Sequence, residues 1–233
     1  MPRKVLFILI AAPLFAALLT ALLHFTYPFV LASEEAQKSI MVTPAQQAEL
    51  ASATLASDLI AFAITGGILC GALALLVGSA PSASQRGIGA AIGLGIGAIA
   101  GAVAGWLGHW IELNPSFEIS DPMVYIVVRW VLMLAVLGVA AGVSVGLASN
   151  NMKNAINLVV GGLLGVVATA ILYGLLVGLV TTPEGRHKIL PFHDANRALL
   201  FVAAFAFIGL GILLQLRNSV LKPAGDTSDS VSP

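Results

Sequence analysis

Long uncharged apolar segments alternate with short polar segments along the whole chain. An α-helix needs about 20 predominantly apolar residues to cross the hydrocarbon core of a bilayer. The pattern therefore predicts an all-α fold, a polytopic membrane helix bundle of six transmembrane helices. The expected spans cover about residues 5–31, 59–78, 87–111, 123–148, 156–180 and 198–216.

The remaining segments are too short for a separate soluble domain. We expect residues 1–221 to form a single membrane domain and residues 222–233, rich in Ser, Asp and Pro, to form a disordered polar tail. The first apolar segment follows Arg3 and Lys4, as in a signal peptide. It is longer than the roughly 7–15 apolar residues of a signal peptide, so a retained helix is expected, with cleavage as the alternative.

Two signals predict where helices begin. Thr43-Pro44 with Gln46 has the pattern of an N-cap, a proline at the first helical position and a capping-box partner. That helix would begin well before its apolar part and project roughly 20 Å beyond the membrane, at 1.5 Å per residue. Asp121-Pro122 repeats the combination of cap and proline.

Glycine spacing predicts how the helices pack. Three sets of glycines recur at intervals of four residues, which places the members of each set along one face of a helix as a groove without side chains. Such grooves predict glycine-zipper packing within a compact core of spans two to five, with spans one and six peripheral; homo-oligomerisation is the alternative use. The sets are Gly89, Gly93, Gly97, Gly101 and Gly105; Gly138, Gly142 and Gly146; Gly161 and Gly165.

A weak internal repeat accompanies these glycines. A shift of 68 residues aligns Gly93 and Gly97 with Gly161 and Gly165. Two helix pairs would then follow each other in the same orientation, as in the parallel repeats of some transporters. Chance alignment of glycine-rich helices is the alternative.

The charge pattern bears on orientation and partners. Only 9% of the 233 residues are charged, against roughly 25% in soluble domains. Lys plus Arg equals Asp plus Glu, so no nucleic-acid partner is indicated. Basic residues gather at one side of the spans, which predicts a multi-pass cell-membrane protein with both termini cytoplasmic. The expected partners are the lipid bilayer and either further copies of the chain or other membrane subunits.

The few ionisable groups near the spans gather at the other side. They are His24, Asp58, His109, Glu112 and Arg129. A charge within hydrocarbon is costly and usually faces protein or water. Arg129 is therefore expected to pair with Asp58 or Glu112; the alternative is that its long side chain reaches the lipid headgroups.

No catalytic, metal-binding or nucleotide-binding motif is present, so neither an enzyme nor a cofactor is expected. His187 and His193 do not have a recognised ligand spacing. Two classes of function are left. One is a non-enzymatic packed bundle with a scaffold or assembly role, favoured because the cytoplasmic halves of the spans contain few polar groups. The other is a small transporter or channel with an outer polar entrance near Arg129.

Overall fold

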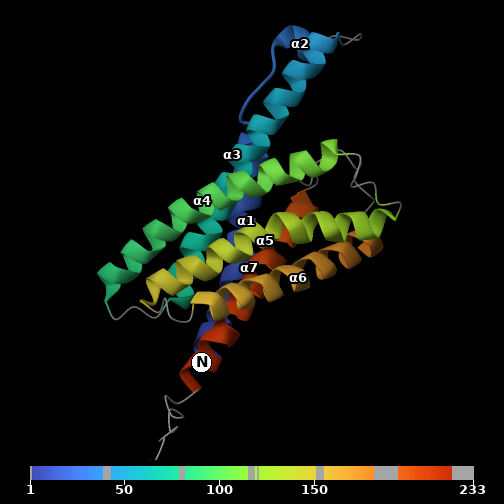
Figure 1. The fold of residues 1–233 in the computed structure, drawn as a ribbon. Coiled ribbons are helices and arrows are strands. Elements are labelled where there is room, and N and C mark those ends of the chain that lie inside the picture. Colours follow the sequence, from blue (N-terminus) through green and yellow to red (C-terminus); the bar gives the residue numbers. More distant parts are fainter. Residues whose placement is uncertain are drawn as a thin grey trace, which may run out of the picture.

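The computed structural model describes residues 2–38, 43–78, 82–114, 119, 121–150, 155–180 and 194–221. The predicted tail, residues 222–233, lies outside these residues. The described part of the chain is all-helical (Figure 1). Its helices are α1 (Pro2–Thr26), α2 (Glu34–Lys38), α3 (Pro44–Val77), α4 (Ala83–Leu113), α5 (Pro122–Ala148), α6 (Ala155–Val180) and α7 (Asp194–Leu221).

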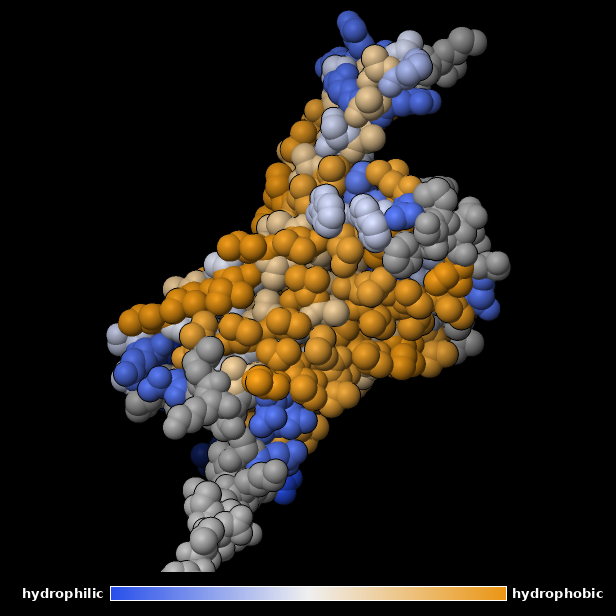
Figure 2. Space-filling model, viewed as in Figure 1, coloured by the Kyte–Doolittle hydropathy of each residue, from blue (hydrophilic) through white to orange (hydrophobic). Residues whose placement is uncertain are grey.

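Six of these helices, all except the short α2, are long and apolar enough to cross a membrane. A broad apolar surface covers the middle of the molecule, with hydrophilic residues concentrated toward its two ends (Figure 2). The prediction of six apolar membrane-crossing helices agrees with this arrangement. The first helix ends at Thr26 rather than near residue 31. The reason is Pro28, which has no N–H to donate and disfavours helical geometry at the residue before it.

The N-terminal part of α3 stands out beyond the other long helices, with α2 beside it (Figure 1). Its start is the predicted capping box. The backbone N–H of Gln46 donates to the Thr43 hydroxyl over 3.3 Å, and the Thr43 backbone N–H donates to Gln46 Oε1 over 2.9 Å. The predicted cap of α5 is also present, because the Asp121 carboxylate accepts the Val124 N–H at 3.1 Å. We call residues 43–56 the stem.

Each of the six long helices contacts the next one along the chain, and α7 contacts α1, so the order of contacts is closed. Three of them, α3, α5 and α7, contact one another in the middle. Each outer helix fills the angle between two central ones: α4 packs on α3 and α5, α6 packs on α5 and α7, and α1 packs on α7 and α3. The first and last helices of the chain are therefore neighbours.

The predicted core of spans two to five, with the sixth span peripheral, was wrong: the third and fifth spans, α4 and α6, are outer helices, whereas the sixth, α7, is central. Phe205, Ile208 and Ile212 of α7 are among the most deeply buried side chains of the molecule. The prediction considered glycine pairs four residues apart, and α7 has none. A single glycine, Gly211, is enough for close approach, because it lies directly against the backbone of Gly161 on α6.

Three glycines in the middle of the α4 row, Gly93, Gly97 and Gly101, lie against the backbone of α3. A Cβ on Gly97 would collide with the carbonyl oxygen of Gly66, and one on Gly101 would collide with that of Phe62. A Cβ on Gly93 would lie 3.0 Å from the carbonyl oxygen of Cys70. The α3 and α4 backbones are therefore closer here than any side chain would permit. At the two ends of the row, Gly89 faces Ala148 of α5 and Gly105 faces Phe62.

Similar close approaches join α5, α6 and α7. A Cβ on Gly138 would lie 3.0 Å from the carbonyl oxygen of Gly162, and one on Gly142 would lie 2.7 Å from Val159. Gly146 has more room, with its nearest neighbours at an ordinary 3.6 Å. On the other face of α6, Gly161 and Gly165 approach Gly211 and Phe207 of α7.

Candidate functional site: a buried polar cluster

The three central helices each bury one charged residue near the same end of the bundle. Asp58 on α3 is 2% exposed, Arg129 on α5 is 6% exposed and Arg197 on α7 is 5% exposed. This is the end at which α1 finishes and α5 and α7 begin. The charges of Arg129, Glu112 and Arg197 act on the Asp58 carboxylate. We call Asp58, Glu112, Arg129 and Arg197, together with Tyr27, the polar cluster.

Tyr27, the first residue after α1, connects two of these charges. Its hydroxyl donates a 2.9 Å hydrogen bond to Asp58 Oδ1. The guanidinium carbon of Arg197 lies 5.5 Å from the centre of the Tyr27 ring, within the range of a cation–π contact. Burial, together with the neighbouring Asp58 carboxylate, raises the pKa of Tyr27 above its ordinary value. The phenol therefore keeps its proton and remains a donor at physiological pH.

A more exposed contact between His24 and Asp194 extends the cluster to the end of α1. His24 Nδ1 lies 2.8 Å from Asp194 Oδ2, and the side chains are 57% and 45% exposed. Asp194 Oδ1 is also 3.4 Å from Nη1 of Arg197. One carboxylate at the start of α7 thus contacts both α1 and the buried arginine.

The segment that follows α1 folds back over the cluster. We call residues 27–38 the strap. The Ser57 hydroxyl, fully buried next to Asp58, accepts the Val30 N–H at 2.9 Å and donates to the Val30 carbonyl at 3.1 Å. Farther along, the Glu49 carboxylate of the stem accepts the backbone N–H of Ser33 at 2.6 Å and its hydroxyl at 3.2 Å.

Most of the predicted polar residues lie in or beside this cluster. Asp58 and Arg129 are buried together, and Glu112 is near enough for its charge to act on Asp58. His24 reaches the cluster through Asp194. His109 is half-buried on α4, and among the described residues no hydrogen bond or ion pair joins it to the cluster. Arg129 lies inside the bundle rather than extending along its lipid-facing surface.

Sequence reasoning left Tyr27, Ser57 and Arg197 out of the site. One signal for Arg197 was available, because it follows Arg129 by the same interval of 68 residues that aligns the glycines. Asp58 and Asp194 are separated by twice that interval. Tyr27 and Ser57 carry no such signal, since their roles depend on the way the chain turns back after α1.

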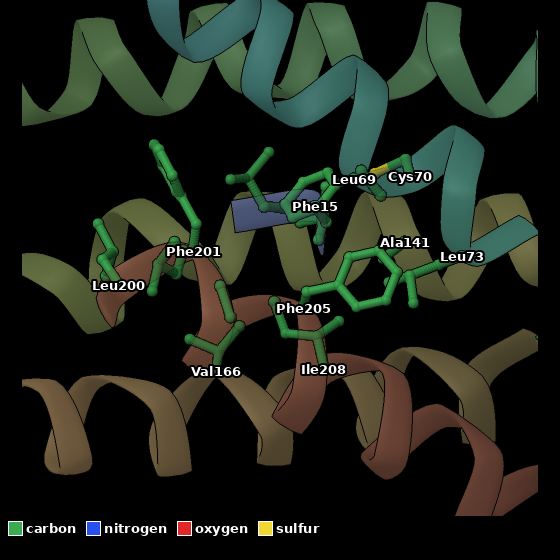
Figure 3. Packing of buried hydrophobic residues seen from close by; sticks show 14 of the residues in the cluster. Phe15, Leu69, Cys70, Leu73, Ala141, Val166, Leu200, Phe201, Phe205 and Ile208 are labelled. Carbon is green, nitrogen blue, oxygen red and sulfur yellow. The ribbon is translucent and has the colours of Figure 1, made fainter. Parts of the chain in front are cut away.

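Beyond the cluster the centre of the bundle is apolar. Leu69 and Leu73 of α3, Ala141 of α5 and Phe205 and Ile208 of α7 pack together there (Figure 3). The buried hydroxyls at this depth bond to their own helix backbones, as expected for such residues in spans. Thr65 donates to Ala61, Ser144 to Ala140 and Thr169 to Gly165 over 2.7–2.8 Å.

The cluster gathers ionisable side chains, most of them buried, at one end of the bundle. It combines two arginines, carboxylates and a phenol, with no nucleophile arranged beside a base. Within the described residues no three His, Cys, Asp or Glu side chains gather closely enough to hold a metal ion. His187 and His193 lie outside the described residues. The chain matches no protein-family model, no curated protein and no solved structure at a significant level.

Proposed function

We propose that the chain is a non-enzymatic membrane protein with a scaffold or assembly role. In this role the helix bundle is a solid base, by which we mean a membrane-embedded unit without a water-filled path. The strap and stem are the part presented outside the bilayer. The observation that carries the proposal is the apolar centre. Leu69, Leu73, Leu137, Phe205 and Ile208 fill the space between the three central helices and are almost fully buried. A hydrated pathway would need polar lining along this depth.

Packing of this kind suits a rigid base. We propose that the glycine rows of α4, α5 and α6 act as glycine zippers that lock the ring of helices together. In a bilayer the hydrophobic effect does not drive helices together, so association depends on close van der Waals contact and hydrogen bonds. The backbone approaches at Gly97, Gly101 and Gly165 supply such contact.

We also propose that both termini are cytoplasmic, so that strap and stem face outward. Arg3, Lys4, Arg86 and Arg217 are at the end that carries the termini, and among the described residues this end has no acidic side chain. Positive residues are retained on the cytoplasmic side of membrane proteins. Glu34, Glu35 and Glu49 lie at the other end, on α2 and the stem.

Native Cys70 tests whether the centre is dry. It is fully buried among the central helices and is the only cysteine of the chain. In membranes, a small water-soluble thiol reagent should leave Cys70 unmodified, while it modifies a cysteine introduced on the exposed stem (Ala51→Cys with Cys70→Ala). A second reporter, Leu137→Cys with Cys70→Ala, should behave like Cys70. Fast reaction at Cys70 or at position 137 would reveal a water-filled path and refute the solid base.

The assembly role has its own test. Particles extracted from the native membrane in polymer nanodiscs should have a protein mass above that of one 23.9 kDa chain. A particle that contains one chain and nothing else would contradict an assembly role.

A small transporter or channel is the second candidate. The observation that favours it is the buried polar cluster, because ionisable groups inside membrane proteins are typical of substrate and ion pathways. The cluster would then be an entrance near Arg129. The thiol experiment separates the two functions, since a conducting path must pass the depth of Cys70 and Leu137.

A further inference from the structure

Two basic side chains from different helices lie together at the end of the bundle where α1 begins. The Lys4 ammonium of α1 donates a 3.0 Å hydrogen bond to the carbonyl of Val77, the last residue of α3. The positive charge of Arg86, near the start of α4, acts on this ammonium. The bond to Val77 therefore holds Lys4 at the boundary between α1 and α3, on the side where α4 begins. We call Lys4 and Arg86 the basic pair.

The surroundings of the basic pair are also positive. Arg3 and Arg217 are exposed at the same end, and among the described residues this end carries no acidic side chain. The connections from α3 to α4 and from α5 to α6, residues 78–82 and 149–154, contain Lys153 and no Asp or Glu. Like charges held close to each other raise each other's energy, and an anion beside both lowers it. The basic pair is therefore suited to bind a negatively charged group.

Exposed apolar side chains lie directly next to these charges. Phe7 and Ile10 share one exposed face of α1 with Arg3, because helical positions three and four residues apart lie one above the other. Ile88 is exposed on α4 close to Arg86, and hydrophilic side chains at the start of α4 adjoin apolar surface (Figure 2). A phospholipid has a charged headgroup followed by apolar chains. It fits both parts of this surface, whereas a soluble anion fits only the charged part.

We propose that the basic pair binds the phosphate of an anionic phospholipid, whose acyl chains lie along α1 and α4. Lysine and arginine bind phosphate through charge-assisted hydrogen bonds, and basic pockets between transmembrane helices bind acidic lipid headgroups. The lipid bridges two outer helices that both pack on α3. This inference does not rest on the scaffold role or on the proposed orientation, because in detergent a lipid reaches both ends of the bundle.

Native mass spectrometry of the full-length protein in detergent counts bound lipids and tests the site. Phosphatidylglycerol and phosphatidylcholine with the same acyl chains are added at equal concentrations, and the parent should bind phosphatidylglycerol more tightly. Lys4→Gln and Arg86→Gln should each weaken this binding by roughly fivefold, the effect expected of one basic residue near an anionic lipid. Lys4→Arg keeps the charge and should bind like the parent. Binding of phosphatidylcholine should be the same in all variants, which reports that their fold is retained.

Arg217→Gln is the matched control. Arg217 is exposed on α7 at the same end of the bundle, and it is not among the charges that act on Lys4. Its removal should leave the binding of phosphatidylglycerol as in the parent. An equal loss in Arg217→Gln and in both variants of the basic pair would overturn the site, because diffuse attraction to a positive surface would explain all three. Equal affinity of the parent for the two lipids would also overturn it.

Two other anions are tested as occupants of the basic pair. Inorganic phosphate should not displace phosphatidylglycerol, because it has no apolar chains. Displacement by phosphate at the concentration of the lipid would assign the site to a soluble anion and overturn the proposal. Asp226 and Asp229 follow α7 in the sequence, and Asp226→Asn with Asp229→Asn should leave lipid binding unchanged. A gain as large as the loss in Lys4→Gln would show that these carboxylates, and not a lipid, occupy the basic pair.

Discussion

The carbonyl oxygen of Gly66 on α3 occupies the place that a Cβ on Gly97 of α4 would need. The two helices therefore meet backbone to backbone, and any side chain at position 97 must push them apart. Two residues away, Gly95 faces open space, with no atom within 4 Å of where its Cβ would be. The same helix thus offers a glycine in a tight contact and a glycine without one.

This contrast gives the first prediction. Gly97→Leu should destabilise the protein by about 1–3 kcal/mol or more, because overpacking forces a rigid backbone contact apart. Gly95→Leu should be close to neutral, since its side chain would point away from the bundle. Unfolding in mixed micelles of increasing denaturing detergent measures the difference. Equal loss of stability in the two variants would mean that helix propensity or insertion, and not the contact with Gly66, sets the cost.

The second prediction concerns α7, where sequence reasoning was wrong. Gly211→Ala should destabilise, because the new methyl group would collide with the backbone of Gly161, which cannot give way without moving α6. Gly209→Ala should cost less, because its methyl would meet the ends of the flexible side chains of Leu73 and Ile8. Melting temperatures of the two variants in the same detergent would compare them. A larger loss for Gly209→Ala would contradict the α6–α7 contact described above.

The sequence was sufficient for the local features and insufficient for the assembly of helices. Apolar length and capping chemistry act within one segment, so the long helices and the start at Pro44 were predictable. The central position of α7 depends on which helices meet, and one glycine such as Gly211 creates a close contact without any periodic pattern. Tyr27 joins the cluster because the end of α1 lies beside Asp58 of α3 and Arg197 of α7, a three-dimensional relationship that spacing does not encode.

The polar cluster likewise combines a local feature that the sequence shows with an arrangement of helices that it does not show. The depth of Asp58 and Arg129 could be read from their positions in the apolar segments, and both are buried at one end of the bundle. Their shared environment with Arg197 follows from the ring arrangement, in which α3, α5 and α7 contact one another. Without that arrangement, each residue has several plausible neighbours at the same depth.

The third prediction tests which part of the cluster contributes to stability. His24→Gln should change the free energy of unfolding by less than about 1 kcal/mol, because the contact of His24 with Asp194 is largely exposed to solvent. Arg197→Gln should cost more, since it removes a buried group that contacts both Asp194 and Tyr27. Denaturation of the two variants under the same conditions compares them, and a larger cost for His24→Gln would contradict this ranking.

The fourth prediction concerns orientation. A cysteine at Ala51, on the exposed stem, should react with a membrane-impermeant reagent added to intact cells, in a Cys70→Ala background. A cysteine at Ser82, exposed at the start of α4 and at the opposite end of the bundle, should react only after the membrane is opened. The reason is the excess of basic residues at the Ser82 end, which favours its retention in the cytoplasm. The reverse pattern would place the termini outside, and reaction of both sites in intact cells would refute the six-span arrangement.

The last prediction concerns the coupling of Arg129 with its neighbouring acids. Arg129 is 6% exposed, and its charge acts on Asp58. Arg129→Leu should destabilise by about 3–5 kcal/mol, because it leaves buried negative charge without its compensating cation. Adding Asp58→Asn should recover part of this loss, while adding Glu112→Gln should recover less, since Glu112 is only half-buried. A double-mutant cycle gives the two coupling energies directly.

Two single variants complete that cycle, and each has an expected result. Asp58→Asn alone should cost less than Arg129→Leu, because the amide oxygen can still accept the hydrogen bond of Tyr27. Glu112→Gln alone should have the smallest effect. A coupling energy near zero for both acids would show that Arg129 is stabilised by groups other than these carboxylates. The buried charges would then act separately on their own helices, and the cluster would no longer be an ion network that ties the three central helices together.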